Sequence, residues 1–178
     1  MTYTLTTEGD MPVSISALRD HCRIQSSDFD TQLSRAWYAA AYDVEVRSGL
    51  LLRPCTVRVS RKGGSGLAGL VLPVGPVDTS SIVLSDENGT TISTGWEVDL
   101  SKAEPTICIT DRSAFDADTV YHLDFDAGLS SLPADLNVAV LELTAHHFEN
   151  REATTDRPLY QVPSSVWAIV ANHGRAKV

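Results

Sequence analysis

A group of acidic and histidine side chains in residues 142–149 could bind a metal ion. If the segment is helical, Glu142 and His146 share a face, and Glu149 follows His146 at the spacing of the next turn. Adjacent histidines point about 100° apart on a helix, so only one of His146 and His147 can join that face. The sequence also lacks the His-Glu-x-x-His pattern. A small metal-dependent hydrolase that uses His146, Glu142 and nearby carboxylates is therefore kept as an alternative function. The simpler interpretation packs one histidine on the core and leaves the other to solvent or a hydrogen bond.

Other catalytic signatures are missing from the sequence. There is no Gly-x-Ser-x-Gly motif to present a nucleophile. The glycine-rich segment 63–69 lacks the Gly-Lys-Ser/Thr ending of a phosphate-binding loop and is predicted to be a mobile hairpin tip. Asp116, Asp118, Asp124 and Asp126 lack the spacing of a calcium loop and are interpreted as solvated turn residues. The residues therefore predict no catalytic residue, no cofactor and no metal site, which is typical of a protein that is not an enzyme.

Composition describes a soluble globular chain with an acidic balance. Its 178 residues are 43% hydrophobic and 21% charged, and 23 acidic against 14 basic residues give a net charge of −9. Such a balance argues against a surface that grips nucleic acid, because phosphate binding depends on clustered Lys and Arg. An acidic wall could still let a DNA duplex slide past without sticking, and acidic surfaces also simply keep proteins soluble.

Neither a membrane segment nor a disulfide framework is predicted. No run reaches the ~20 apolar residues of a membrane span, and the N-terminus lacks the layout of a signal peptide, so we expect a cytoplasmic origin. Cys22, Cys55 and Cys108 are an odd number with no close pair, and we interpret them as small buried apolar residues.

The elements that would position these residues are predicted from caps and periodicity. After a loose arm over residues 1–11, a short helix begins at Ser14 or Ser16 and ends near Arg23. A longer helix starts in the segment 27–30 and stops at Gly49. A final short helix covers residues 163–172 and precedes a basic tail.

The segment Leu132–Glu152 is predicted to be the central helix. Pro133 and Asp135 suit its first turn. Two apolar rows follow along it, which predicts that neighbours cover the helix on at least two sides. The first row is Leu136, Val140, Leu143 and His147, and the second is Leu141, Ala145 and Phe148.

Between the helices, residues 51–126 have the short β-branched runs and turn residues of an antiparallel sheet. Strands are predicted at residues 56–60, 80–84, 90–93, 106–110 and 120–125, with a tight hairpin turn at Asn88-Gly89. The prediction is thus an α+β fold: a small core of about four helices (residues 12–50 and 132–173), with an antiparallel β-rich insertion (51–126) between the second and third helices. We expect one domain over residues 1–178, with flexible termini.

Four segments, in this order, carry a resemblance to a known family: Pro12–Arg23, Leu70–Val77, Leu132–Glu152 and Val162–Val170. In sequence, order and spacing these segments resemble those of the head–tail connector (adaptor) proteins of long-tailed bacteriophages and gene transfer agents. The resemblance implies a structural protein that assembles into a ring, typically a dodecamer, beneath the portal protein of a particle made in the bacterial cytoplasm. It further implies contacts with portal, with stopper or tail-terminator proteins and with other copies of the chain, while DNA passes through the lumen without specific binding.

The resemblance also implies which residues meet partners. The last helix and tail resemble the segment that reaches the portal, with Trp167, Arg175 and Lys177 as the expected partner-binding residues. A competing interpretation places Trp167 in the core of its own chain. The sheet region 51–126 is expected to face neighbouring copies or tail components. A generic β-sheet binding module of a cellular protein remains a further alternative.

Overall fold

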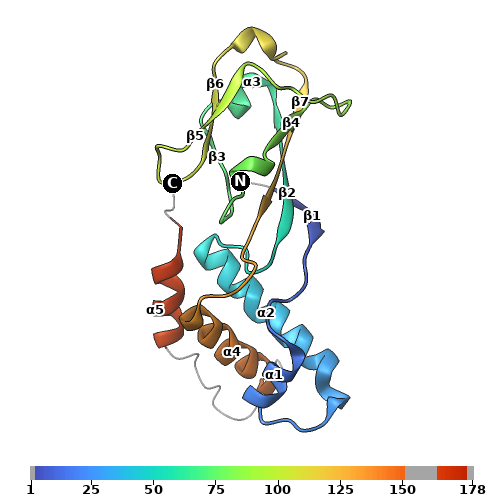
Figure 1. Cartoon of the computed structure of the whole chain (residues 1–178), viewed down its shortest axis with the longest axis vertical. Helices are drawn as coiled ribbons and strands as arrows, with labels where there is room; N and C mark the ends of the chain where they lie inside the picture. Colours follow the sequence, from blue (N-terminus) through green and yellow to red (C-terminus); the bar gives the residue numbers. More distant parts are fainter. Residues whose placement is uncertain (1–2, 151–163, 176–178) are drawn as a thin grey trace. The chain divides into compact units, whose positions relative to one another are not determined.

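The chain forms two compact units that interleave along the sequence. The computed structural model describes residues 3–150 and 164–175 (Figure 1). The helical unit comprises residues Met11–Leu52 and Ser130–Gly174, and the sheet unit comprises Met1–Asp10, Arg53–Leu129 and Arg175–Val178. The structure contains both helices and antiparallel strands, and the strand-rich region lies between α2 (Asp30–Ser48) and the central helix, α4 (Ala134–Glu149). This arrangement confirms the predicted α+β class. That both units act as one domain stays a prediction.

The first helix of the helical unit begins at a predicted cap and the second ends at one, but the second begins without the side-chain cap that the sequence predicts. Helix α1 (Ile15–His21) starts after Ser14, whose Oγ accepts a hydrogen bond from the Ala17 amide at 3.2 Å. A 3₁₀ turn, η1 (Ser27–Phe29), leads into α2 (Asp30–Ser48). Gly49 then adopts the left-handed conformation, with φ of 73°, that ends the helix.

The core of the helical unit is formed where α2 packs against α4 (Ala134–Glu149). Trp37 and Leu33 of α2 are fully buried there. On α4 one face is buried, and its members are Leu136, Ala139, Val140, Leu143 and Thr144. The predicted second row is wrong in degree, because Leu141, Ala145 and Phe148 are only half-buried, although α1, α2 and the last helix, α5 (Ser164–His173), all pack against α4. Phe148 meets Phe29 edge to face, with ring centroids 6.1 Å apart.

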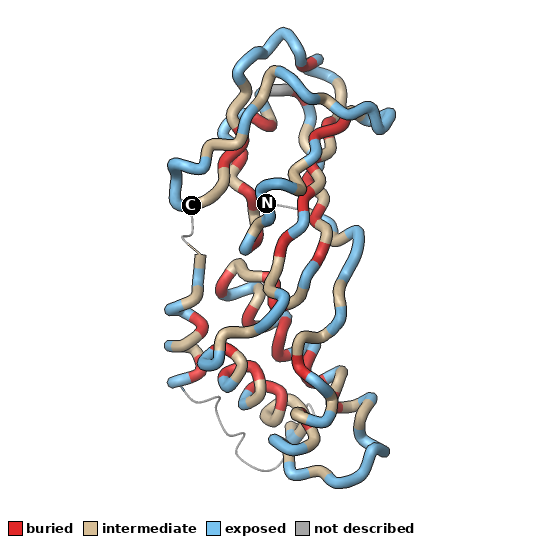
Figure 2. The backbone as a smooth tube through the Cα atoms, in the orientation of Figure 1, coloured by how far each residue is buried: buried red, intermediate tan, exposed pale blue. Residues whose placement is uncertain are grey.

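The sheet unit contains two antiparallel sheets. The four-stranded sheet has the order β1 (Thr4–Glu8), β2 (Cys55–Lys62), β7 (Val120–Ala127), β4 (Val83–Ser85), and the three-stranded sheet has the order β3 (Leu70–Val71), β6 (Thr106–Ile109), β5 (Trp96–Asp99). Buried residues recur at every second position of β2 and β7, as the tube of Figure 2 shows by colour. One face of the larger sheet is therefore apolar and the other polar.

Three sequence predictions for this region are corrected. The N-terminal arm is not loose, because residues 4–8 pair with β2 as strand β1. The glycine-rich segment forms a short helix, α3 (Gly63–Leu67), in which Gly63 has φ of +66° and lies so close to the Ala117 carbonyl that a Cβ would come within 2.7 Å of its oxygen. The Asn88-Gly89 turn forms as expected, but an isolated Ser85–Thr91 bridge replaces the second strand at 90–93.

Aspartate side chains close the turns of the sheet unit. Asp78, Asp99 and Asp111 each accept hydrogen bonds from the amide and hydroxyl of the serine two residues later. Asp86 accepts from the Asn88 and Thr90 amides. Of the aspartates that the sequence analysis interpreted as turn residues, Asp116 accepts a hydrogen bond from the Asp118 amide, but the interpretation is wrong for Asp124 and Asp126, which lie within strand β7.

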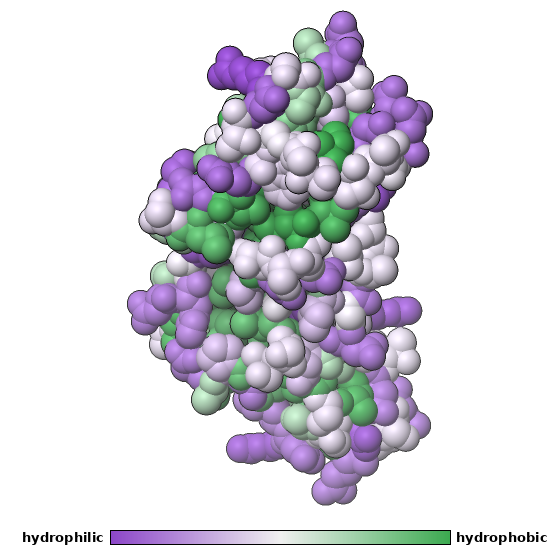
Figure 3. Space-filling view, turned by 45° about the horizontal axis from the view of Figure 1, so that its top comes forward, coloured by the Kyte–Doolittle hydropathy of each residue, from purple (hydrophilic) through white to green (hydrophobic). Residues whose placement is uncertain are grey.

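Several large hydrophobic side chains remain exposed. They are Phe29, Tyr38, Tyr42, Val46, Val83, Leu100 and Val138. Figure 3 shows that one face of the molecule carries groups of hydrophobic side chains among hydrophilic ones. Three of the exposed residues, Tyr38, Tyr42 and Val46, follow one another at four-residue intervals along α2.

Candidate partner-binding surfaces

The last helix, α5 (Ser164–His173), presents the first of the predicted partner-binding residues. Val166 and Val170 bury one side of α5 within the helical unit. Trp167 is half-buried, and the Arg47 guanidinium lies over its ring, 4.1 Å from the centroid. Trp167 therefore contributes to its own unit and still leaves part of its surface accessible.

A polar contact fixes the end of α5. His173 Nε2 lies 2.8 Å from Asp135 Oδ2 at the start of α4. This hydrogen bond, together with the Leu136 amide, holds the pKa of Asp135 below its ordinary value. The helix ends before Gly174, where the sequence predicts a break.

Arg175 lies in the sheet unit and is already engaged there. Its Nε donates to Glu104 Oε2 at 2.7 Å, and its Nη2 contacts the same carboxylate and the Leu72 carbonyl at 3.1 Å. The guanidinium also packs 3.3 Å from where a Cβ on Gly75 would lie. The Arg175 and Glu104 side chains are only 12% and 14% exposed. Lys177 lies outside the described residues.

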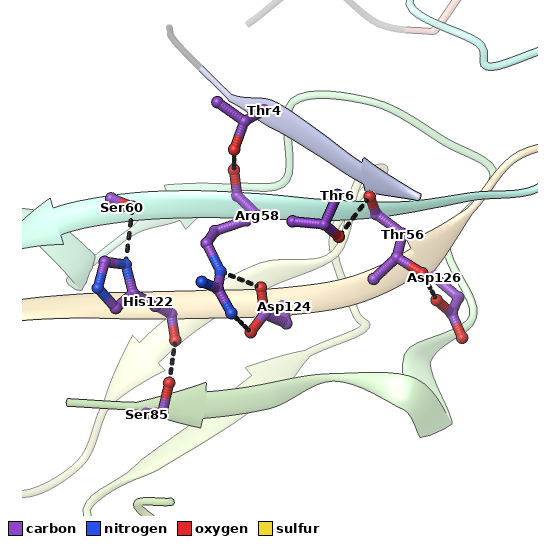
Figure 4. Close-up of polar contacts among 9 residues, drawn as sticks. All are labelled: Thr4, Thr6, Thr56, Arg58, Ser60, Ser85, His122, Asp124 and Asp126. Carbon is purple, nitrogen blue, oxygen red and sulfur yellow. Dashed lines mark hydrogen bonds and ion pairs between the residues drawn. The ribbon is translucent and has the colours of Figure 1, made fainter. Parts of the chain in front are cut away.

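The polar face of the larger sheet is a ladder of cross-strand pairs (Figure 4). Arg58 and Asp124, direct partners in the register of β2 and β7, form a two-pronged ion pair with both N–O distances at 2.7 Å. The neighbouring rungs are Thr56 with Asp126 at 2.8 Å and Ser60 with His122 at 2.8 Å. We call these six residues the polar ladder.

The central pair of the polar ladder, Arg58 with Asp124, balances its two charges internally. The hydrogen bonds and charge of Asp124 raise the pKa of Arg58, so its cation is held within the pair. A guanidinium that already has a carboxylate partner is a poor ligand for a phosphate, because binding would first require breaking that pair. The Arg58 guanidinium is therefore not available to a phosphate while its pair with Asp124 is intact.

The Ser60–His122 rung is the one arrangement here that resembles a nucleophile and its base. Sequence reasoning missed it, since the two residues are 62 positions apart and only the strand register joins them. Among the described residues no carboxylate hydrogen-bonds to His122, although a third group normally orients the base of such a pair. Ser60 is exposed on the sheet face. The rung therefore lacks the orienting group of a catalytic triad.

The residues proposed for a metal are separated by other contacts. His147 Nε2 lies 3.0 Å from Asp43 Oδ2, and His146 Nδ1 contacts the Asn150 side chain at 3.3 Å. Glu142 is exposed. Within residues 3–150 and 164–175, no three His, Cys, Asp or Glu side chains form a group that could hold a metal ion. This finding weighs against the hydrolase hypothesis.

A pocket of about 260 Å³ in the helical unit offers no acid–base chemistry either. Residues around the start of α1 and around the start of α4 line it, among them Val13, Ser14, Leu132 and Asn137. No ionisable side chain lies in its wall. A pocket of this composition could hold an apolar group but supplies no general acid or base.

Comparisons with known proteins give a fold match and nothing at the level of sequence families. No family model and no curated protein matches the sequence. Similar chains occur in a structure of the virion of a native gene transfer agent particle (TM-score 0.76, 24% identity) and in the neck of an empty particle computed with C6 symmetry (TM-score 0.75, 25% identity). A third, in the neck of a native particle computed with C12 symmetry, has a TM-score of 0.66 and 24% identity. Each match covers 100% of this chain and 97% of the other.

The match covers the whole of this chain and nearly all of the other, so the helical unit and the sheet unit are both parts of the shared fold. Among the described residues, no helix combines the length and the apolar character that crossing a membrane requires.

Proposed function

We propose that this protein is a structural component of the neck of a gene transfer agent or phage-like particle. The observation that carries the proposal is the full-length fold similarity to chains of gene transfer agent virions and necks. The lack of a metal-binding group among the described residues, and of an orienting acid at Ser60–His122, is consistent with a structural role. The fold similarity therefore supports a role in assembly.

Within the neck, we propose the role of a connector that forms a ring beneath the portal and joins it to stopper or tail-terminator proteins. Identical chains form a closed ring when one surface of each copy binds a different surface of the next. The C6 and C12 symmetries of the matched necks support a ring of this kind, and twelve copies is the number we propose. The ring would extend the DNA channel, and its net charge of −9 would keep the duplex from adhering.

The portal contact is proposed to lie on α5 and the residues after it, with Trp167, Arg175 and Lys177 as the anchors. Trp167 has the accessible aromatic surface that protein interfaces favour. Arg175 is held by Glu104 in this structure, so its use by the portal would require that pair to open. We propose that isolated copies are monomers, and a stable dodecamer formed without portal would contradict this part.

Removing the protein from cells that make the particle tests the proposed function. The expected result is DNA-filled heads without tails, with joining restored by the wild-type chain supplied in trans. A chain with Trp167→Ala should restore joining poorly, while Ile169→Ala, a change on the same helix, should restore it well. Normal tailed particles in the absence of the protein would overturn the proposal.

A further inference from the structure

The outer face of α2 carries a stripe of exposed aromatic and apolar residues. The α2 stripe consists of Arg35, Tyr38, Ala39, Tyr42 and Val46. Tyr42 is 66% exposed and Val46 is 62% exposed, which is high for large apolar side chains that follow one another along a helix. Exposed side chains such as Tyr42 and Val46 are typical of a protein–protein contact, in which Tyr and Arg are favoured.

The outer face of α4 carries a second stripe with acidic character. The α4 stripe consists of Val138, Glu142, Ala145 and Glu149, and Val138 is 48% exposed. At the helical repeat these residues share one side, opposite the buried Leu136, Val140 and Leu143.

The two stripes point in opposite directions. Helices α2 and α4 pack against each other through their buried faces, so the exposed face of each is directed away from the other. A single copy therefore offers two different surfaces on opposite sides of its helix pair. Two such surfaces are what a repeated, rotationally closed contact between identical chains requires.

The stripes also match in length and chemistry when one is reversed. Each spans eleven residue steps, or about 16.5 Å of helix. In antiparallel alignment Arg35 comes opposite Glu149, Tyr42 opposite Glu142, and Val46 opposite Val138. Ala39 comes opposite Ala145, and two small residues allow the helices to approach closely. Four of the five residues of the α2 stripe thus meet a partner of opposite charge, a hydrogen-bonding partner or a small or apolar side chain of the α4 stripe.

We propose that the α2 stripe of one copy binds the α4 stripe of the next copy, antiparallel, and that this contact is repeated around the ring. The proposal rests on the proposed function and names the surfaces that the ring uses. The occupant is a second copy because the complement of the α2 stripe, in both spacing and charge, is present on the same chain. A stripe made for an unrelated partner would not require this internal match.

Site-directed cross-linking in assembled particles tests the contact. A chain with both Tyr42→Cys and Glu142→Cys is expressed in place of the wild type, and the particles are purified and oxidised. The proposal predicts a ladder of covalent multimers of the chain, since each copy would be joined to two neighbours. Wild type and each single variant control for the native cysteines, and a thermal melt of each purified variant checks its folding.

A matched pair on the same stripes tests the alignment. Val46→Cys with Glu149→Cys places the two thiols at opposite ends of an antiparallel contact, about 16 Å apart, so no ladder is expected. A ladder from this pair, or none from the first pair in particles that contain the protein, would overturn the proposed contact. Particles made with the wild-type chain that lack the protein altogether would overturn the proposed function instead.

Charge reversal provides a second, independent test of the same contact. Arg35→Glu should lower the amount of the chain incorporated into particles, and Glu149→Arg in the same chain should restore it. Loss with no recovery in a double variant that folds normally would contradict the pairing of these two residues.

Discussion

The helical unit and the sheet unit treat their exposed side chains in opposite ways. On the polar ladder of the sheet unit, a charged group such as Arg58 faces a partner on the next strand of the same chain. On α2 of the helical unit, Tyr42 and Val46 lie on the surface with most of their area exposed. A surface whose polar groups are already paired within the chain offers little to a binding partner. A surface with exposed apolar area is suited to a protein–protein contact. The comparison therefore supports the proposed contact between copies through the helices and a passive role for the polar face of the sheet.

The largest effect is expected in the core of the helical unit. Trp37→Ala should lower the free energy of unfolding by about 3–5 kcal/mol, because it leaves a cavity where a fully buried ring packed. Urea denaturation measures this. Tyr42→Ala, on the exposed face of the same helix, should change stability by less than about 0.5 kcal/mol. Equal losses from the two variants would mean that the outer face of α2 is covered within the single chain.

The next effect concerns the partly buried ion pair between Arg175 and Glu104 in the sheet unit. Glu104→Ala leaves the Arg175 guanidinium without its main partner and should lower the free energy of unfolding by about 2–3 kcal/mol. The exposed Glu97→Ala is the matched control and should be near neutral. If Glu104→Ala is equally neutral in a denaturation experiment, Arg175 is not held in solution and is available to a partner.

Phe148 separates the sequence-based expectation from the structure. A central helix covered on two sides predicts a loss of ~3–5 kcal/mol for Phe148→Ala. The half-buried ring with an edge contact to Phe29 predicts only about 1.5 kcal/mol. Thermal or urea unfolding distinguishes the two values, and the larger one would indicate that the far side of α4 is covered as well.

A smaller effect is expected from the polar ladder. A double-mutant cycle on Arg58→Met and Asp124→Asn should give a coupling of about 0.5–1 kcal/mol, the range for an exposed cross-strand ion pair. Free energies of unfolding of the two single variants and the double variant supply the cycle. A coupling energy near zero would mean that Arg58 and Asp124 do not stabilise the fold through their contact, and it would weaken the contrast between the two units.

The smallest effect per residue is an acid dependence of the turns in the sheet unit. Hydrogen bonds from Ser80, Thr90, Ser101 and Ser113 hold the pKa of Asp78, Asp86, Asp99 and Asp111, respectively, below the ordinary value of about 3.9. Because the folded-state pKa is lowered, this stabilisation is complete above about pH 4 and is lost as pH falls through the lowered values.

Amide signals followed by NMR during acidification should therefore report changes at Ser80, Ser101 and Ser113 below pH 4. Asp111→Asn is the matched control, because its amide oxygen still accepts hydrogen bonds but does not titrate. Turn signals in Asp111→Asn that shift with pH as in the wild type would contradict this origin.

The fold was predictable where the signal is local. Ser14 caps the start of α1 because its hydroxyl accepts a hydrogen bond from a backbone amide, and Gly49 ends α2 because glycine adopts a positive φ angle. The Asn88-Gly89 turn forms for the same reason, since Gly89 also has a positive φ angle. The strand β1 was missed because its stability comes from pairing with β2, some fifty residues away, and not from its own polar sequence.

The candidate site was predictable only in part for the same reason. Trp167 could be singled out by residue type, but its contact with Arg47 depends on how α5 packs. The pairs Arg175–Glu104 and Arg58–Asp124 join residues 71 and 66 positions apart, so no spacing in the sequence reveals them. Composition identifies charges, and only the register shows which of them are already paired.

The measurement that tests the central claim most directly is a reconstruction of the neck of the particle that this protein is made with. The account predicts a ring of identical copies of this fold at the head–tail junction, with α2 of each copy beside α4 of the next. A neck whose density is completely explained by other chains would contradict it.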